Sequence, residues 1–207
     1  MALGTYSDLK TSVANYLARD DLTSQIPDFI TLAEARMNKD LRLRHMLKRA
    51  NANTASGDDT VALPANFLEA RDMYVEGSPK RQLDFVTPSH FSRIRAGSES
   101  GKPVTFTIVG SEFLLGPTPD GVHTLEITFY QKIPALSDTT TSNDILVHYP
   151  DIYLYATLIE AEPFLQNDQR LQTWSSLYQS AVAAATVSND REQFSGGPLQ
   201  MRSIYKT

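Results

Sequence analysis

The sequence predicts an α+β fold: helices from both ends of the chain form one α-helical bundle, with an antiparallel β-sheet unit inserted between them. Apolar residues recur at spacings of three and four near both ends, but alternate with polar residues in the middle. Elements segregated in this way are typical of α+β proteins. The expected domains are 1–45 with 144–189 (helical bundle), 46–143 (β domain) and 190–207 (an extended C-terminal arm).

The stretch from Tyr149 to Val187 predicts two antiparallel helices. Pro150 suits a first helical position, and the residues from 152 to 161 are apolar almost all round, which is typical of a helix buried on several sides. Pro163 is expected to end this helix. The second helix carries one apolar stripe, formed by Leu171, Trp174, Tyr178, Ala181 and Ala185. We expect the single tryptophan to lie in the seam between the two helices.

Two further helices are expected before residue 46. Thr5 and Asp8 form a variant of the capping box at the start of the first helix, and Ser24 is a suitable N-cap for the second. Cations crowd the last turns expected for the second helix, where they would complement its dipole. These cations are Arg36, Lys39, Arg42 and Arg44.

Alternation and turn signals predict short strands in the middle of the chain. The expected strands cover residues 60–63, 71–76, 104–109, 112–115 and 124–131, and residues 46–54 are expected to form a strand or an extended arm. Phe67 and Leu68 are expected to anchor a turn, and Thr87-Pro88 to start a short helix. The last three strands follow one another closely, so we expect them to form a β-meander.

The basic residues are concentrated in one zone. The window from Arg36 to Arg49 holds six Lys or Arg against the single acid Asp40, a charge of +5 that leaves −10 for the rest of a chain with net charge −5. This zone could be a solvated helix end, an ion-pairing surface for a neighbouring subunit, or a phosphate contact. The candidate subunit-interface charges are Arg36, Lys39, Arg42, Arg44 and Glu160, the last preferred as an ion-pair partner over a catalytic role.

Enzymatic chemistry has no specific signature in the sequence. The four histidines are scattered and cysteine is absent, and we find neither a zinc-protease, a P-loop nor a nucleophile-elbow motif. We therefore expect no enzyme activity, no catalytic residue, no metal and no cofactor. No stretch has the length of a membrane span or the pattern of a signal peptide, so we expect no membrane contact and a cytosolic origin.

The C-terminal segment has apolar residues but no visible core to join. Gly196-Gly197-Pro198 breaks any regular element, and the apolar residues of the segment are Phe194, Leu199, Met201, Ile204 and Tyr205. The segment could be a frayed terminus or an arm that becomes ordered on a partner.

Several ordered segments together resemble the head-to-tail adaptor proteins of tailed bacteriophages, also called connector or tail tubular proteins. These segments are residues 26–42, 62–69 and 149–165, together with Pro117-Thr-Pro119 and the stretch from Tyr130 to Leu136. The resemblance covers about residues 5 to 190 and rests on the order of segments, not on a catalytic motif.

The resemblance implies a structural virion protein at the neck, between head and tail, assembled in the host bacterial cytoplasm. Such proteins form a ring, usually a dodecamer, that binds below the portal protein, extends the DNA channel and offers a platform to the next tail or nozzle protein. Genomic DNA would pass through the lumen without sequence-specific binding. The C-terminal extension would grip the portal, which gives the five apolar residues of the arm a role. The alternatives are another phage neck or tail-completion protein, or a nucleic-acid-binding or enzymatic module unrelated to virions.

Overall fold

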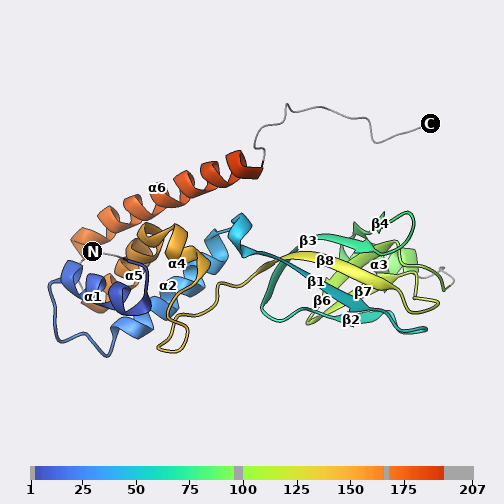
Figure 1. The fold of residues 1–207 in the computed structure, drawn as a ribbon, viewed down its shortest axis with the longest axis horizontal. Coiled ribbons are helices and arrows are strands. Elements are labelled where there is room, and N and C mark those ends of the chain that lie inside the picture. Colours follow the sequence, from blue (N-terminus) through green and yellow to red (C-terminus); the bar gives the residue numbers. More distant parts are fainter. Residues whose placement is uncertain (1–2, 96–99, 166–167, 194–207) are drawn as a thin grey trace. The chain divides into compact units, whose positions relative to one another are not determined.

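The computed structural model describes residues 3–95, 100–165 and 168–193 (Figure 1). The chain forms two compact units, one from the segments 1–45 and 133–207 and the other from residues 46–132. N-terminal helices pack against C-terminal helices in the first unit, and two four-stranded sheets make up the second, which confirms the α+β prediction. The β unit ends at residue 132 instead of the expected 143, because residues 133–143, the connector to the C-terminal helices, are hydrogen-bonded to helix residues.

The N-terminal helices are α1 (Tyr6–Leu17) and α2 (Ile26–Asp40). The Thr5 hydroxyl accepts a hydrogen bond from the Asp8 amide at 3.2 Å, so the predicted cap of α1 is confirmed. The expectation that Ser24 caps α2 is wrong. Gln25 holds the cap position, and the carbonyl of Leu22 already accepts hydrogen bonds from the amides of Gln25 and Ile26.

Three C-terminal helices complete this unit: α4 (Asp144–His148), α5 (Pro150–Leu165) and α6 (Asp168–Gln193). The predicted start of α5 at Pro150 is confirmed. Pro163 does not end the helix, which continues to Leu165. Only two residues follow the proline, and the first of them, Phe164, packs on Phe29 at 5.5 Å between ring centroids.

Two further features of the C-terminal helices differ from expectation. Helix α6 passes the expected end of the bundle at residue 189, because Asn189 near its end is buried and hydrogen-bonded to the backbone of Arg44. Helix α4 was not predicted, although Asn143 caps it in the usual way by accepting from the Leu146 amide. It occupies the start of the segment 144–189 that was assigned to the helical bundle, before Pro150, where no separate element was expected.

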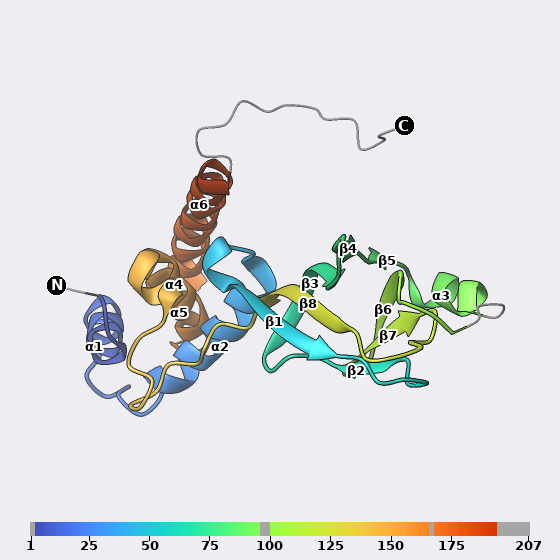
Figure 2. The same cartoon turned by 45° about the vertical axis from the view of Figure 1, so that its right-hand side comes forward.

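Helix α5 is the centre of the helical unit. It contacts α1, α2 and α6 (Figure 2). Because other helices surround it, α5 carries apolar residues on nearly all sides and lacks a polar face. Its side chains at Ile152, Tyr153 and Leu158 are fully buried. Within the described ranges, no helix is both long and apolar enough to cross a lipid bilayer.

The β unit contains two sheets with strand orders β1-β8-β3-β4 and β2-β7-β6-β5. The strands are β1 (Leu47–Asn53), β2 (Thr60–Ala62), β3 (Phe67–Val75), β4 (Arg81–Gln82), β5 (Asp84–Phe85), β6 (Thr105–Val109), β7 (Glu112–Gly116) and β8 (Thr124–Gln131). The short helix α3 (Pro88–Arg95) starts where it was predicted. Phe67 and Leu68 begin strand β3, so the expected turn there is wrong.

The predicted meander is also wrong. Strands β6 and β7 form a hairpin, but β8 lies in the other sheet between β1 and β3. The segment Pro117–His123 between β7 and β8 carries the chain from one sheet to the other. The buried face of β8 (Leu125, Ile127 and Phe129) then joins the core that both sheets share.

Candidate assembly surfaces

Most of the predicted interface charges have partners in the same chain. The Arg36 guanidinium lies 2.6 Å from Glu160 and joins α2 to α5, and the Arg44 guanidinium pairs with Glu192 on α6. Helix α2 ends at Asp40, so Arg44 does not lie in its last turn as expected. Both ion pairs neutralise charge within the subunit. Because they are partly exposed, they contribute little to its stability.

The other two predicted interface cations, Arg42 and Lys39, differ from Arg36 and Arg44 in their surroundings. Arg42, which also lies beyond the end of α2, donates to the carbonyl oxygens of Asn38 and Leu41 at 3.0 and 2.6 Å. Lys39 is exposed in the last turn of α2. That these charges and Glu160 meet a neighbouring subunit stays a prediction.

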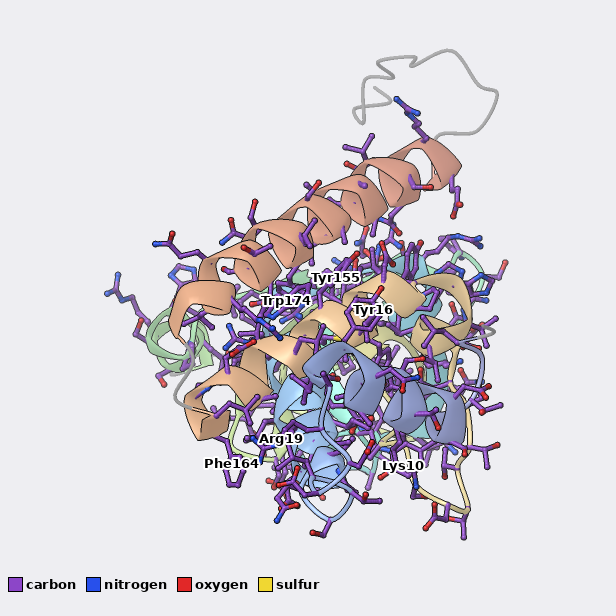
Figure 3. All side chains as sticks on the ribbon, turned by 90° about the vertical axis from the view of Figure 1, so that its left-hand side faces the viewer. Lys10, Tyr16, Arg19, Tyr155, Phe164 and Trp174 are labelled. Atoms are coloured by element: carbon purple, nitrogen blue, oxygen red, sulfur yellow. The ribbon has the colours of Figure 1, made fainter. Side chains whose placement is uncertain are left out.

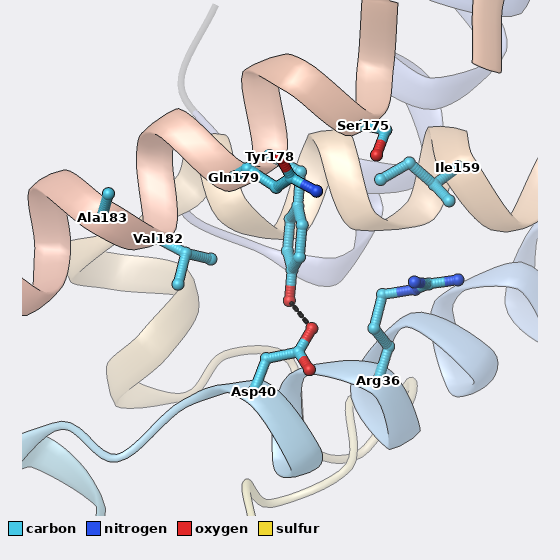
Figure 4. A pocket seen from close by; sticks show the side chains of 8 residues that line it. All are labelled: Arg36, Asp40, Ile159, Ser175, Tyr178, Gln179, Val182 and Ala183. Atoms are coloured by element: carbon cyan, nitrogen blue, oxygen red, sulfur yellow. Dashed lines mark hydrogen bonds between the residues drawn. The ribbon is translucent and has the colours of Figure 1, made fainter. Parts of the chain in front are cut away.

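A partly open groove of about 370 Å³ lies between α2, α5 and α6 beside the Arg36–Glu160 pair (Figure 4). Across it the Tyr178 hydroxyl donates to an Asp40 carboxylate oxygen at 2.9 Å. Burial, followed by the hydrogen bond to Asp40, raises the pKa of Tyr178, so this hydroxyl remains a donor at neutral pH. Ser175 lines the groove, and the described residues that line it include no histidine.

A buried carboxylate that the sequence analysis missed holds the connector onto the helices. One Glu34 oxygen accepts from the Leu136 amide at 2.8 Å and from the Tyr153 hydroxyl at 3.2 Å. Asn143 donates to the same hydroxyl at 2.6 Å and to the carbonyl of Pro134 at 2.8 Å. Burial, as the largest influence, raises the pKa of Glu34. Glu34 lies one helical turn from the buried residues Ile30 and Met37 of α2, and this position on the apolar face was the signal that could have revealed it.

Trp174 lies between α5 and α6, as predicted. Its indole N–H donates to Glu162 at 2.8 Å, and its ring centroid is 6.3 Å from that of Tyr155 and 6.1 Å from that of Tyr16. The three rings come from three different helices (Figure 3). The tryptophan is only partly buried, so the cluster forms both a joint between helices and part of the surface.

We expect Trp174→Ala to lower the free energy of unfolding by about 2–3 kcal/mol, since a partly buried aromatic ring and one hydrogen bond to a buried carboxylate are lost. Trp174→Phe keeps most of the ring contacts and should cost about half as much. Denaturant unfolding followed by circular dichroism measures both. Equal stability of the alanine variant and the parent would refute the structural role of this ring.

Large apolar side chains are exposed on the helical unit. Tyr16, Leu32 and Phe164 are 48%, 52% and 56% exposed. Figure 3 labels Tyr16 and Phe164 on the face that also carries Trp174. Exposed apolar and aromatic side chains gathered on one part of a surface are typical of protein–protein interaction sites.

Two histidines stack where the chain leaves the helical unit. The rings of His45 and His148 lie 4.3 Å apart, Tyr149 packs edge-on against His45, and His45 Nδ1 is buried with no hydrogen-bond partner among the described residues. Burial first, then His148 and Arg44, lower the pKa of His45, whereas the nearby carboxylates of Glu192 and Asp144 oppose this.

The lowered pKa of His45 predicts a pH dependence of stability. Below the usual histidine pKa of about 6.5 the unfolded chain binds a proton that the folded chain resists, so stability should fall as the pH drops through this range. Denaturant unfolding between pH 5 and 8 measures the effect. His45→Gln should flatten the profile and His90→Gln, an exposed change on α3, should not; parallel profiles for all three proteins would contradict the assignment.

Two further parts of the sequence analysis concern metal ligands and the C-terminal arm. In the part of the chain that the structure describes, no three His, Cys, Asp or Glu side chains gather closely enough to hold a metal ion. The five apolar residues of the C-terminal arm (Phe194, Leu199, Met201, Ile204 and Tyr205) lie outside the described residues.

The described residues carry intrachain ion pairs and exposed aromatic side chains, and exposed aromatic side chains are typical of surfaces that contact other proteins. The family model described as SU10 adaptor protein matches residues 4–202. The chain therefore belongs to the SU10 adaptor protein family, which confirms the resemblance to phage head-to-tail adaptors and implies a non-enzymatic role. A comparison with curated proteins gave no match.

Proposed function

We propose that twelve copies of this chain assemble into a ring. The ring binds below the portal, extends the DNA channel and offers the tail its attachment platform. The observation that carries this proposal is the family match, which spans both structural units and continues past the end of α6 to residue 202. A virion location at the neck is consistent with this family.

The surfaces of the helical unit support assembly into a ring. A closed ring of identical subunits needs two different, complementary faces on each copy. The exposed side chains of Tyr16, Leu32 and Phe164 provide apolar area for one such face, and exposed Lys39 together with Glu160 remains our proposal for polar contacts. Of the other proposed interface charges, Arg36 and Arg44 would act there as pairs with Glu160 and Glu192, and Arg42 would act while it donates to backbone carbonyl oxygens.

The charge distribution supports a channel through which DNA slides. The chain has a net charge of −5, and Arg36, Arg44 and Arg49 each have a carboxylate within the same chain. Fewer cations are then available to phosphates, which are the contacts that give proteins tight, sequence-independent affinity for DNA.

Electron microscopy of portal rings mixed with the purified chain tests the proposal. The expected result is an additional ring at the narrow end of each portal, absent from portal alone. If no ring is added, the chain occupies another position as a neck or tail-completion protein. Tight DNA binding that weakens steeply with salt would instead favour a nucleic-acid-binding module.

A further inference from the structure

The β unit has an apolar groove of about 420 Å³ that the ring proposal does not use. The side chains that line it come from the start of β3, from β5 and from β6, and include Phe67, Phe106 and Ile108. Phe85 on β5 also lines it and is 58% exposed, although its ring packs against Phe106. Arg71 lies at the same groove.

Two incomplete strand edges border this groove. Strand β5 pairs with β6 only at Thr105 and Phe106, so the edge of β6 from 107 to 109 has no partner strand among the described residues. Strand β4 likewise covers only the end of β3, at Tyr74 and Val75. The edge of β3 is interrupted by two register shifts, whereas that of β6 is regular. Free backbone groups on a regular edge favour the addition of another strand.

The C-terminal segment has the pattern of such a strand. Leu199, Met201, Ser203 and Tyr205 alternate with Gln200, Arg202 and Ile204, so three of the four side chains on one face of an extended segment would be apolar. The fourteen residues from 194 to 207 that follow α6 can reach about 46 Å when extended. Gly196, Gly197 and Pro198 separate the alternating stretch from α6.

We propose that residues 199–205 of one copy bind in this groove of a second copy, as a strand added to the open edge of β6, before a portal is present. Both the apolar segment and the apolar groove are then covered in the unassembled protein. Each copy offers one segment and one groove, so the contact is heterologous, as a ring requires. The contact between two copies does not depend on the proposed function. Only the later transfer of the segment to the portal rests on it.

Disulfide trapping between copies tests the contact without any portal. The chain has no cysteine, so an Arg71→Cys protein and a Ser203→Cys protein bring the only thiols into the mixture. On mild oxidation we expect a disulfide between the two proteins. Val122→Cys replaces Arg71→Cys in the control, because Val122 is 73% exposed in the same unit and does not line the groove. At least ten-fold less product is expected from the control.

The specificity of the trapped contact can be tested in the same assay. Phe85→Ser in the Arg71→Cys protein should reduce trapping about ten-fold, and Val122→Ser should leave it unchanged. Equal trapping at 71 and 122, no trapping, or trapping only within one chain that carries both cysteines would overturn the proposal. Portal docking is scored separately by microscopy, so either proposal can fail alone.

Strand pairing can be separated from simple apolar contact with synthetic peptides of residues 199–205. An unmodified peptide should compete with trapping. Of two peptides N-methylated at the odd or at the even positions, one should lose competition, because a strand at a sheet edge presents alternate amides to its neighbour. Equal competition by both methylated peptides would rule out an added strand.

Discussion

Replacing Glu34 by alanine is expected to lower the free energy of unfolding by about 3–5 kcal/mol, the largest effect of any single substitution proposed for this chain. The change leaves the Leu136 amide and the Tyr153 hydroxyl without the acceptor they now share. Each buried group that loses its partner costs about 1–3 kcal/mol, and the space left by the side chain adds to this. Denaturant unfolding followed by circular dichroism gives the value.

Two variants control this measurement. Glu34→Gln keeps an oxygen acceptor of the same shape and should cost much less than alanine. Lys39→Ala changes an exposed residue of the same helix and should stay within about 0.5 kcal/mol of the parent. Hydrogen exchange at the Leu136 amide should accelerate only in the alanine variant. A loss below 1 kcal/mol for Glu34→Ala would show that the connector is not held by this carboxylate.

Deleting Gly197–Thr207 is expected to abolish docking to the portal while leaving the fold intact. The deleted residues include four of the five apolar residues proposed for the portal contact, and without them the arm loses most of its apolar area. Both units have buried cores among the described residues, and the deletion removes none of these side chains. Cosedimentation with portal rings measures docking, and the melting temperature by circular dichroism measures the fold.

A matched control separates the effect of the alternating pattern from the effects of length and composition. A chain whose residues 199–205 are scrambled so that apolar and polar residues no longer alternate should melt like the parent. It should dock at least ten-fold more weakly. Normal docking by the truncated protein would remove the arm from the portal contact and leave the helical surfaces to provide it.

The sequence by itself determined the elements whose signals are local. Thr5 caps α1 because the hydroxyl and the amide that it binds are three residues apart, and α5 starts at Pro150 because that ring presets the helical backbone. Strand β8 was predicted at its observed bounds from alternation alone. The family resemblance also came from ordered segments, and it agreed with the match over residues 4–202.

Only the tertiary structure decided how those elements combine. Alternation predicts a strand but not its neighbour, so β8 was expected beside β7 and lies between β1 and β3. Glu34 is a buried hydrogen-bond acceptor because a connector about one hundred residues away folds back onto α2. In the basic zone from Arg36 to Arg49, three arginines pair with Glu160, Glu192 and Glu126, which come from distant parts of the chain. Contacts between distant residues depend on loop closure and packing, which local patterns do not encode.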